Sequence, residues 1–103
     1  MGEFNNQMEG FGSGIAEDSS FGLPPERNVV FYNDDFTTME FVVAVLVSIF
    51  NKSQDEAESL MQQVHVNGSS VVGTYTFDIA VSRAKLTTQV ARKNGFPLRV
   101  EVE

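Results

Sequence analysis

Four polar side chains in two short stretches of the chain could act together on a ligand: Asn33, Asp34, Asp35 and the single histidine, His65. Amide and carboxylate oxygens accept hydrogen bonds, and a neutral imidazole offers one acceptor nitrogen. In an extended segment Asn33 and Asp35 share a face, whereas Asp34 points away. Asparagine and aspartate are also common as plain turn residues, so this group needs support from the rest of the chain.

Three kinds of site are compatible with these residue types. A metal site usually needs three or four ligands, and one histidine with two adjacent aspartates supplies few. A Ser-His-Asp hydrolase would draw on Ser69 or Ser70, but no nucleophile elbow or glycine-rich oxyanion loop accompanies them. Recognition of an ammonium group suits the acceptors, because an amine offers three donors. The residues alone leave all three alternatives open.

Apolar residues near the polar group could line a pocket beside it. Thr37, Met39 and Val42 follow the polar stretch, and Met61 and Val64 precede His65 on the same predicted helix. The same residues would serve equally well in an ordinary hydrophobic core. Taken alone, the pattern favours the core interpretation.

The elements that must position these residues follow from periodicity and capping signals. Residues 29–32 (VVFY) form a continuous apolar, β-rich run, which predicts a buried strand. Thr37 and Glu40 match a capping box, in which each side chain bonds the backbone amide of the other residue. We therefore expect a largely buried helix from there to about Phe50.

The second half of the chain repeats these signals. Residues 53–56 (SQDE) match another capping box, and the helix behind them should end at Asn67-Gly68. Residues 71–76 predict a strand, and Thr76 is expected to cap a third helix that ends at Asn94-Gly95. Residues 98–102 alternate apolar and charged side chains, which predicts a half-exposed last strand. If the two-helix hairpin folds back on the first strand, His65 approaches Asn33.

The predicted order of elements is β-α-α-β-α-β. One sheet with its helices packed on one face is the economical two-layer arrangement for this order. The sequence therefore predicts an α+β, two-layer sandwich with a three-stranded antiparallel sheet and three helices.

The composition limits the classes of partner. Of the 14 acidic residues, five lie in residues 1–26, which contain no Lys or Arg and hold five of the eight glycines. We expect this segment to be a flexible acidic tail, and residues 27–103 to form one folded domain. The net charge of −7 argues against a nucleic-acid partner. Because no apolar run approaches membrane-helix length and the N-terminus is unlike a signal peptide, we expect a cytoplasmic protein. We also expect it to be a monomer.

Several motifs resemble the ClpS family, whose members are adaptors that deliver N-degron substrates to a ClpA- or ClpC-type AAA+ unfoldase and its protease. The resemblance covers about residues 28–103. It rests on residues 33–43 (NDDFTTMEFVV), 60–68 (LMQQVHVNG), 71–80 (VVGTYTFDIA) and the end FPLRVEVE. Separate motifs in the same order and spacing make this a specific match.

The resemblance implies a role for each group of residues. It implies an adaptor without catalytic residues, cofactor or metal, which binds a first residue of type Phe, Leu, Trp or Tyr. Met39 would discriminate against β-branched first residues, and the tail would engage the unfoldase. The implied amine-binding residues are Asn33, Asp34, Asp35 and His65, the implied hydrophobic pocket is Thr37, Met39, Val42, Met61, Val64 and Leu98, and the implied unfoldase-docking residues are Asp78 and Arg83.

The chain departs from the family at Thr38, where ClpS proteins usually have proline. Proline is favoured at the first helical position, so we expect threonine there to weaken the start of the helix slightly. The competing interpretation is a protein-interaction module without a degron pocket. A domain of the same sandwich fold occurs at the C-terminus of a ribosomal stalk protein.

Overall fold

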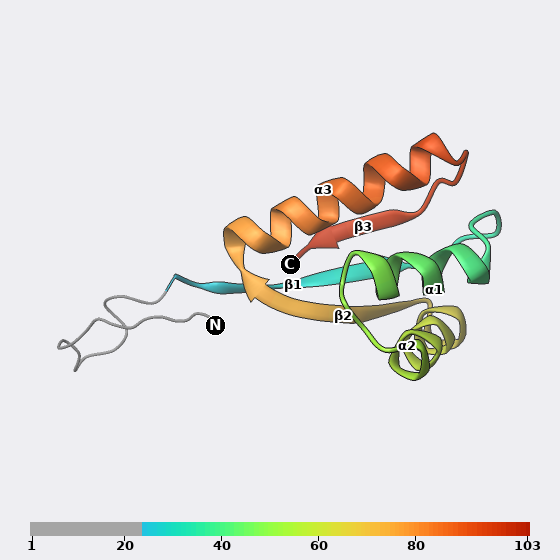
Figure 1. The fold of residues 1–103 in the computed structure, drawn as a ribbon, viewed down its shortest axis with the longest axis horizontal. Helices are drawn as coiled ribbons and strands as arrows, with labels where there is room; N and C mark the ends of the chain where they lie inside the picture. Colours follow the sequence, from blue (N-terminus) through green and yellow to red (C-terminus); the bar gives the residue numbers. More distant parts are fainter. Residues whose placement is uncertain (1–23) are drawn as a thin grey trace, which may run out of the picture.

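The computed structural model describes residues 24–103, which form one sheet and three helices (Figure 1). The elements are β1 (Glu26–Tyr32), α1 (Met39–Ser48), α2 (Gln54–Asn67), β2 (Ser69–Thr76), α3 (Phe77–Lys93) and β3 (Arg99–Val102). This order confirms the predicted α+β arrangement. The predicted tail, residues 1–26, lies almost wholly outside the described residues, although Glu26 is the first residue of β1.

The sheet has the strand order β2-β1-β3, and both pairings are antiparallel. Figure 1 shows α3 running beside β3, while α1 and α2 pack together next to β2. Val29 and Phe31 on the central strand are fully buried. They belong to one core cluster to which all three helices contribute, including Val45, Leu46, Ala57, Val64, Ala80, Ala84 and Ala91.

The opposite face of the sheet carries polar side chains. Thr74 donates a hydrogen bond to Asn28 across β1 and β2, and Tyr32 donates one to Glu103. The Arg99 guanidinium lies 4.2 Å from the centre of the Tyr32 ring. The sheet therefore packs the helices on one face only, as the two-layer prediction requires.

The start of α1 differs from the prediction. Thr38, not Thr37, is the N-cap, and its hydroxyl accepts a hydrogen bond from the Phe41 amide at 3.2 Å. The predicted Thr37–Glu40 capping box is wrong because the amide and hydroxyl of Thr37 both bond Asp34 instead. Thr38 therefore stabilises the start of α1 with its side chain, and the expectation that it occupies the first helical position is also wrong.

The other helix ends agree better with the sequence signals. Ser53 and Glu56 form the predicted capping box at the start of α2, and Gly68 ends that helix with a positive φ of 88°. Thr76 occupies the N-cap position of α3, but its side chain makes no capping hydrogen bond. Within residues 24–103, no helix has both the length and the apolar character needed to cross a membrane.

Candidate functional site

The turn between β1 and α1 is held in place by Asp34. Its Oδ1 accepts hydrogen bonds from the amides of Phe36 and Thr37 at 2.8 and 2.7 Å, and its Oδ2 accepts the Thr37 hydroxyl at 2.8 Å. Partial burial by itself would raise the pKa of Asp34. The hydrogen bonds from Thr37 and Phe36 outweigh it, so the pKa lies below its usual value. Asp34 thus fixes the backbone that presents its neighbours.

The end of α2 is tied to the same turn by the backbone. The amide of Asn33 donates to the carbonyl of Gly68 at 2.9 Å, which continues the pairing of β1 with β2 past Tyr32 and Ser69. Because Gly68 directly follows α2, this bond brings the last turn of that helix, and with it His65, beside the turn. His65 therefore lies near Asn33, as predicted from a two-helix hairpin that folds back on the first strand.

A hollow of about 440 Å³ opens between the turn, α1 and α2. It gathers nine of the ten residues that the sequence predicted for amine binding and for the hydrophobic pocket. Phe36, Thr38 and Glu40 also line it; the sequence interpretation did not assign them to the site, although they alternate with predicted residues in the same stretch. The predicted residues among its lining are Asn33, Asp34, Asp35, Thr37, Met39, Val42, Met61, Val64 and His65.

Leu98 is the predicted pocket residue that does not line this hollow. It precedes β3 and is only 1% exposed, packed within the core cluster. Its side chain therefore contributes to the stability of the domain rather than to the surface of the hollow.

The polar lining consists of side chains that the fold leaves accessible. Asn33, Asp35 and His65 are exposed. Within residues 24–103 none of their side chains makes a hydrogen bond, in contrast to the fully engaged carboxylate of Asp34. The hollow therefore offers amide, carboxylate and imidazole acceptors to a ligand.

The apolar lining combines rigid and adaptable side chains. Val42 and Val64 are buried and continue into the core. Met39 is 41% exposed and Met61 is partly buried, and both side chains line the hollow. Methionine is unbranched and polarizable, so it can adjust to side chains of different shape.

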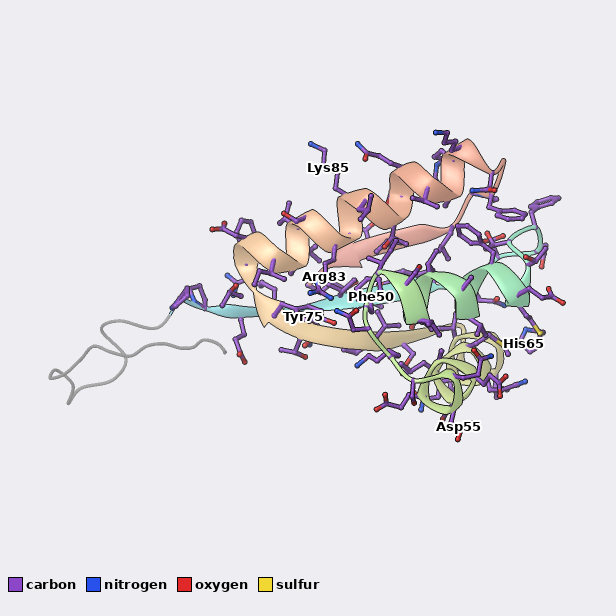
Figure 2. All side chains as sticks on the ribbon, viewed as in Figure 1. Phe50, Asp55, His65, Tyr75, Arg83 and Lys85 are labelled. Carbon is purple, nitrogen blue, oxygen red and sulfur yellow. The ribbon has the colours of Figure 1, made fainter. Side chains whose placement is uncertain are left out.

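The predicted docking residues lie elsewhere. Arg83 on α3 donates to the Ile49 carbonyl at 2.8 Å, and its guanidinium lies 4.8 Å from the centre of the Tyr75 ring. Figure 2 shows Arg83, Tyr75 and Phe50 gathered well away from His65. Asp78 is exposed in the first turn of α3. In the described part of the chain, no group of three or more His, Cys, Asp or Glu residues could hold a metal ion.

Known proteins resemble the whole of this fold. The family model for the ATP-dependent Clp protease adaptor protein ClpS matches residues 23–101. The chain belongs to the ClpS family. Like the family, it is an adaptor of an ATP-dependent Clp protease and not an enzyme, which excludes the hydrolase alternative at Ser69 or Ser70.

Individual relatives cover most of the chain. The ClpS adapter of Treponema denticola is 52% identical over 80 residues, which is 78% of this chain and 79% of that protein. The ClpS adapter of Nitratidesulfovibrio vulgaris (strain DP4) is 40% identical over 94 residues, 91% of this chain and 90% of that protein. The structure of Agrobacterium tumefaciens ClpS2 bound to L-phenylalaninamide superposes with a TM-score of 0.76 at 38% identity, covering 79% of this chain and 98% of ClpS2.

Proposed function

We propose that the hollow beside Asn33 binds the first residue of a substrate protein, through its free α-amino group and its bulky hydrophobic side chain. The adaptor would then deliver such N-degron substrates to a ClpA- or ClpC-type AAA+ unfoldase. The observation that carries this proposal is the hollow itself, where exposed acceptors stand beside an apolar wall. The ligand of the ClpS2 relative supports it, because L-phenylalaninamide has a free α-amino group and a phenyl side chain.

The amine would be bound by Asn33, Asp35 and His65. A protonated amine has three donors, which match an amide oxygen, a carboxylate and a neutral imidazole nitrogen. Hydrogen bonds to a charged group are stronger than neutral ones and contribute about 1.5–3 kcal/mol each. Asp34 would contribute indirectly, because it fixes the turn that carries Asn33 and Asp35.

The side chain of the first residue would enter between Thr37, Val42 and Val64, with Met39 and Met61 at the entrance. Burying a Phe or Leu side chain contributes about 1.5–3 kcal/mol. Neither the amine nor the side chain alone gives tight binding, but together they reach the micromolar range, about −8 kcal/mol. A charged first residue would bind more weakly because its charge would lose its hydration in the hollow. A small first residue would bind more weakly because it would leave the hollow unfilled.

The test compares a Phe-initiated peptide with its N-acetylated twin. Acetylation removes the charge and most donors while it leaves the phenyl group intact. We expect the acetylated peptide to bind at least tenfold more weakly by calorimetry, since one charged hydrogen bond accounts for about that factor. Equal affinities for the two peptides would refute the proposal.

A variant pair sharpens this test within the protein. His65→Ala should reduce affinity for the free-amine peptide, whereas Val66→Ala should not. Val66 is the next residue on α2, is 74% exposed and does not line the hollow. An interaction module without a degron site would tolerate both substitutions equally.

Delivery to the unfoldase is proposed from the family resemblance. It assigns docking to Asp78 and Arg83 and hand-over to the segment formed by residues 1–26. Deletion of residues 1–20 should spare peptide binding but abolish degradation of a Phe-initiated reporter by the purified unfoldase and protease. Loss of peptide binding as well would show that the segment belongs to the binding site.

A further inference from the structure

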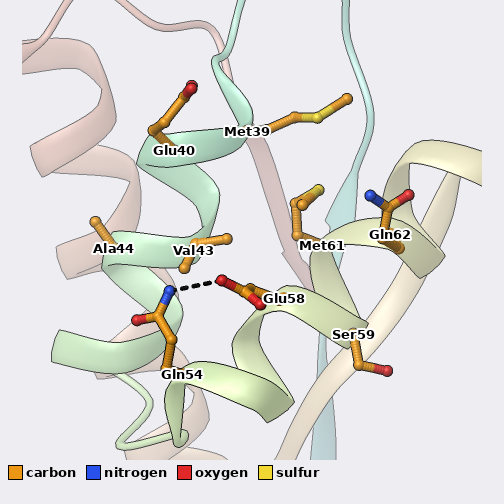
Figure 3. A pocket seen from close by; sticks show the side chains of 9 residues that line it. All are labelled: Met39, Glu40, Val43, Ala44, Gln54, Glu58, Ser59, Met61 and Gln62. Atoms are coloured by element: carbon orange, nitrogen blue, oxygen red, sulfur yellow. Dashed lines mark hydrogen bonds between the residues drawn. The ribbon is translucent and has the colours of Figure 1, made fainter.

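The three helices carry charges of opposite sign on the two sides of the domain. Helices α1 and α2 carry four acidic residues and no Lys or Arg. Two of these acids, Glu40 and Glu58, line the hollow between the two helices (Figure 3). By contrast, α3 carries a single acid, Asp78, and four basic residues: Arg83, Lys85, Arg92 and Lys93. A negatively charged segment is therefore repelled by α1 and α2 and attracted by α3.

Helix α3 also exposes apolar side chains next to its basic ones. Ile79 is 45% exposed and Leu86 is 47% exposed. They are seven residues apart, about two helical turns, so they lie on the same side of α3, and Lys93 continues the same line. Lys85 is exposed beside Leu86. These four residues, which we call the outer strip of α3, suit a partner that combines apolar and acidic side chains.

The chain's own N-terminal segment, residues 1–23, combines these two features. It contains no Lys or Arg, so its charge is opposite to that of the outer strip and equal in sign to that of α1 and α2. Its acidic residues are Glu3, Glu9, Glu17 and Asp18, and its phenylalanines are Phe4, Phe11 and Phe21.

This segment joins the domain next to the start of α3. The Phe77 amide donates a hydrogen bond to the Pro25 carbonyl at 3.3 Å, and the Arg27 guanidinium lies 5.9 Å from the centre of the Phe77 ring. Figure 1 shows β1 and α3 beginning at the same end of the molecule. From Phe77 to Lys93 the helix rises about 24 Å. An extended chain advances about 3.3 Å per residue, so Glu17 reaches about 26 Å from Pro25, as far as the end of α3.

We propose that residues 1–23 bind along the outer strip of α3 in the same chain. The carboxylates of Glu17 and Asp18 face the lysines of the strip. Phe21 covers Leu86, because its reach of about 13 Å from residue 25 matches the rise of α3 from residue 77 to residue 86.

The contact would regulate docking of the unfoldase. Asp78 and Arg83, the docking residues implied by the family resemblance, lie on the same helix as the outer strip. An unfoldase that docks there would have to displace residues 1–23, so docking would release the segment for hand-over. This consequence rests on the proposed function, whereas the contact itself does not.

The test places a nitroxide label on the segment of the full chain. The chain has no cysteine, so Ser13→Cys provides one attachment point. The label broadens the amide NMR signals of the residues that it approaches. At low salt we expect stronger broadening at Leu86 and Lys93 than at Glu58 and Gln62 on α2. High salt should remove the difference, because it screens exposed charges.

Two charge reversals in the labelled chain provide the matched comparison. Lys85→Glu should reduce the broadening at Lys93 about two- to fivefold, the range of an exposed ion pair. Lys52→Glu reverses a charge in the loop between α1 and α2, outside the strip, and should leave the broadening unchanged. The proposal is overturned if α2 and α3 broaden equally, or if the two reversals have the same effect.

A mixed sample excludes binding between molecules. Isotope-enriched chains without the label are mixed with labelled chains that are not enriched, so that only contacts between two molecules cause broadening. The signals of α3 should stay sharp. Broadening on α3 in this mixture would show that the segment of a second copy occupies the strip, and would overturn the contact within one chain.

The effect on docking is measured separately with the purified unfoldase. Glu17→Gln combined with Asp18→Asn should tighten docking of the full chain about two- to fivefold, because it weakens the competing contact. Unchanged docking would overturn the competition. Failure of the wild type to dock at all would instead refute the proposed delivery, since the label reports the contact with no unfoldase present.

Discussion

The hollow beside Asn33 and the layer formed by Phe50, Tyr75 and Arg83 use polar side chains in opposite ways. In the layer, the fold already satisfies Arg83: its guanidinium donates a hydrogen bond to the Ile49 carbonyl and lies against the Tyr75 ring. The centre of the Tyr75 ring lies 6.2 Å from the centre of the Phe50 ring. At the hollow, Asn33 and Asp35 are held by a rigid turn but keep their own side chains accessible.

This difference separates the two sets of residues that the family resemblance singled out. A side chain that the fold already satisfies contributes mainly to stability, whereas an exposed acceptor on a fixed backbone contributes mainly to binding. Substitutions in the two regions should therefore separate affinity from stability.

Asp35→Asn should reduce affinity for a Phe-initiated peptide about tenfold to a hundredfold, because it removes the charge that we propose faces the amine. The melting temperature should hardly change, since Asp35 is exposed and makes no hydrogen bond within residues 24–103. Calorimetry and thermal denaturation measure the two quantities side by side. Lower stability at unchanged affinity would mean that Asp35 contributes to folding rather than to binding.

Gly73→Ala should reduce stability by about 1–3 kcal/mol through overpacking. A Cβ atom at residue 73 would lie 2.6 Å from Cε2 of the Tyr75 ring, which covers the glycine. For a domain of this size each kcal/mol lowers the melting temperature by roughly 4–8 °C. Peptide affinity below the transition should stay within twofold.

A double variant checks that the Tyr75 ring is the cause. In a Tyr75→Thr background the shorter side chain leaves room at residue 73. Adding Gly73→Ala there should therefore reduce the stability much less than it does in the wild type. An equal cost in both backgrounds would show that the strand itself, rather than the ring, rejects the methyl group.

Arg83→Met should reduce stability by about 1–2 kcal/mol, from the lost hydrogen bond to Ile49 and the lost cation–π contact. Arg83→Lys should recover only part of this, because an ammonium does not reproduce the planar guanidinium. Urea denaturation measures the stability. An unchanged denaturation midpoint with weaker unfoldase binding would assign Arg83 to docking and not to the layer.

Substitution of Asp34 should have the smallest effect on stability, and that effect should depend on pH. Its pKa in the folded chain is lowered by the hydrogen bonds from Thr37 and Phe36, against a value near 3.9 in the unfolded chain. The carboxylate therefore contributes stability above about pH 4, and this contribution is lost as the pH falls through the folded pKa.

Asp34→Asn should accordingly flatten the acid side of a stability curve measured by urea denaturation between pH 3 and 7. Asp55→Asn is the control, since Asp55 is exposed and its carboxylate accepts no hydrogen bond within residues 24–103. The same slope in Asp34→Asn and the wild type would mean that the turn does not depend on this charge.

Local signals in the sequence predicted much of this fold. The order of elements followed from periodicity, and the Ser53–Glu56 capping box was confirmed because both partners lie within one helical turn. The start of α1 was predicted wrongly because Asp34, three residues before Thr37, competes for the same hydroxyl. Such competition between two local hydrogen bonds is decided by backbone geometry that the sequence pattern does not specify.

Contacts between distant residues were less accessible from the sequence. The bond between Arg83 and Ile49 joins residues 34 positions apart, so no spacing rule indicates it. Leu98 was assigned to the pocket by resemblance, whereas its position before β3 buries it in the core. The hollow beside Asn33 depends on how α1 and α2 pack against each other, which hydrophobic periodicity alone does not describe.

The single backbone bond from the Asn33 amide to the Gly68 carbonyl has a kinetic consequence. It lies at the end of the β1–β2 pairing, where ladders fray most readily, and it joins the two segments that carry Asn33 and His65, which we propose bind the amine. Each opening of this pair would pull Asn33 away from His65 and release a bound ligand. Hydrogen–deuterium exchange at the Asn33 amide should therefore slow when a ligand binds, in proportion to ligand occupancy.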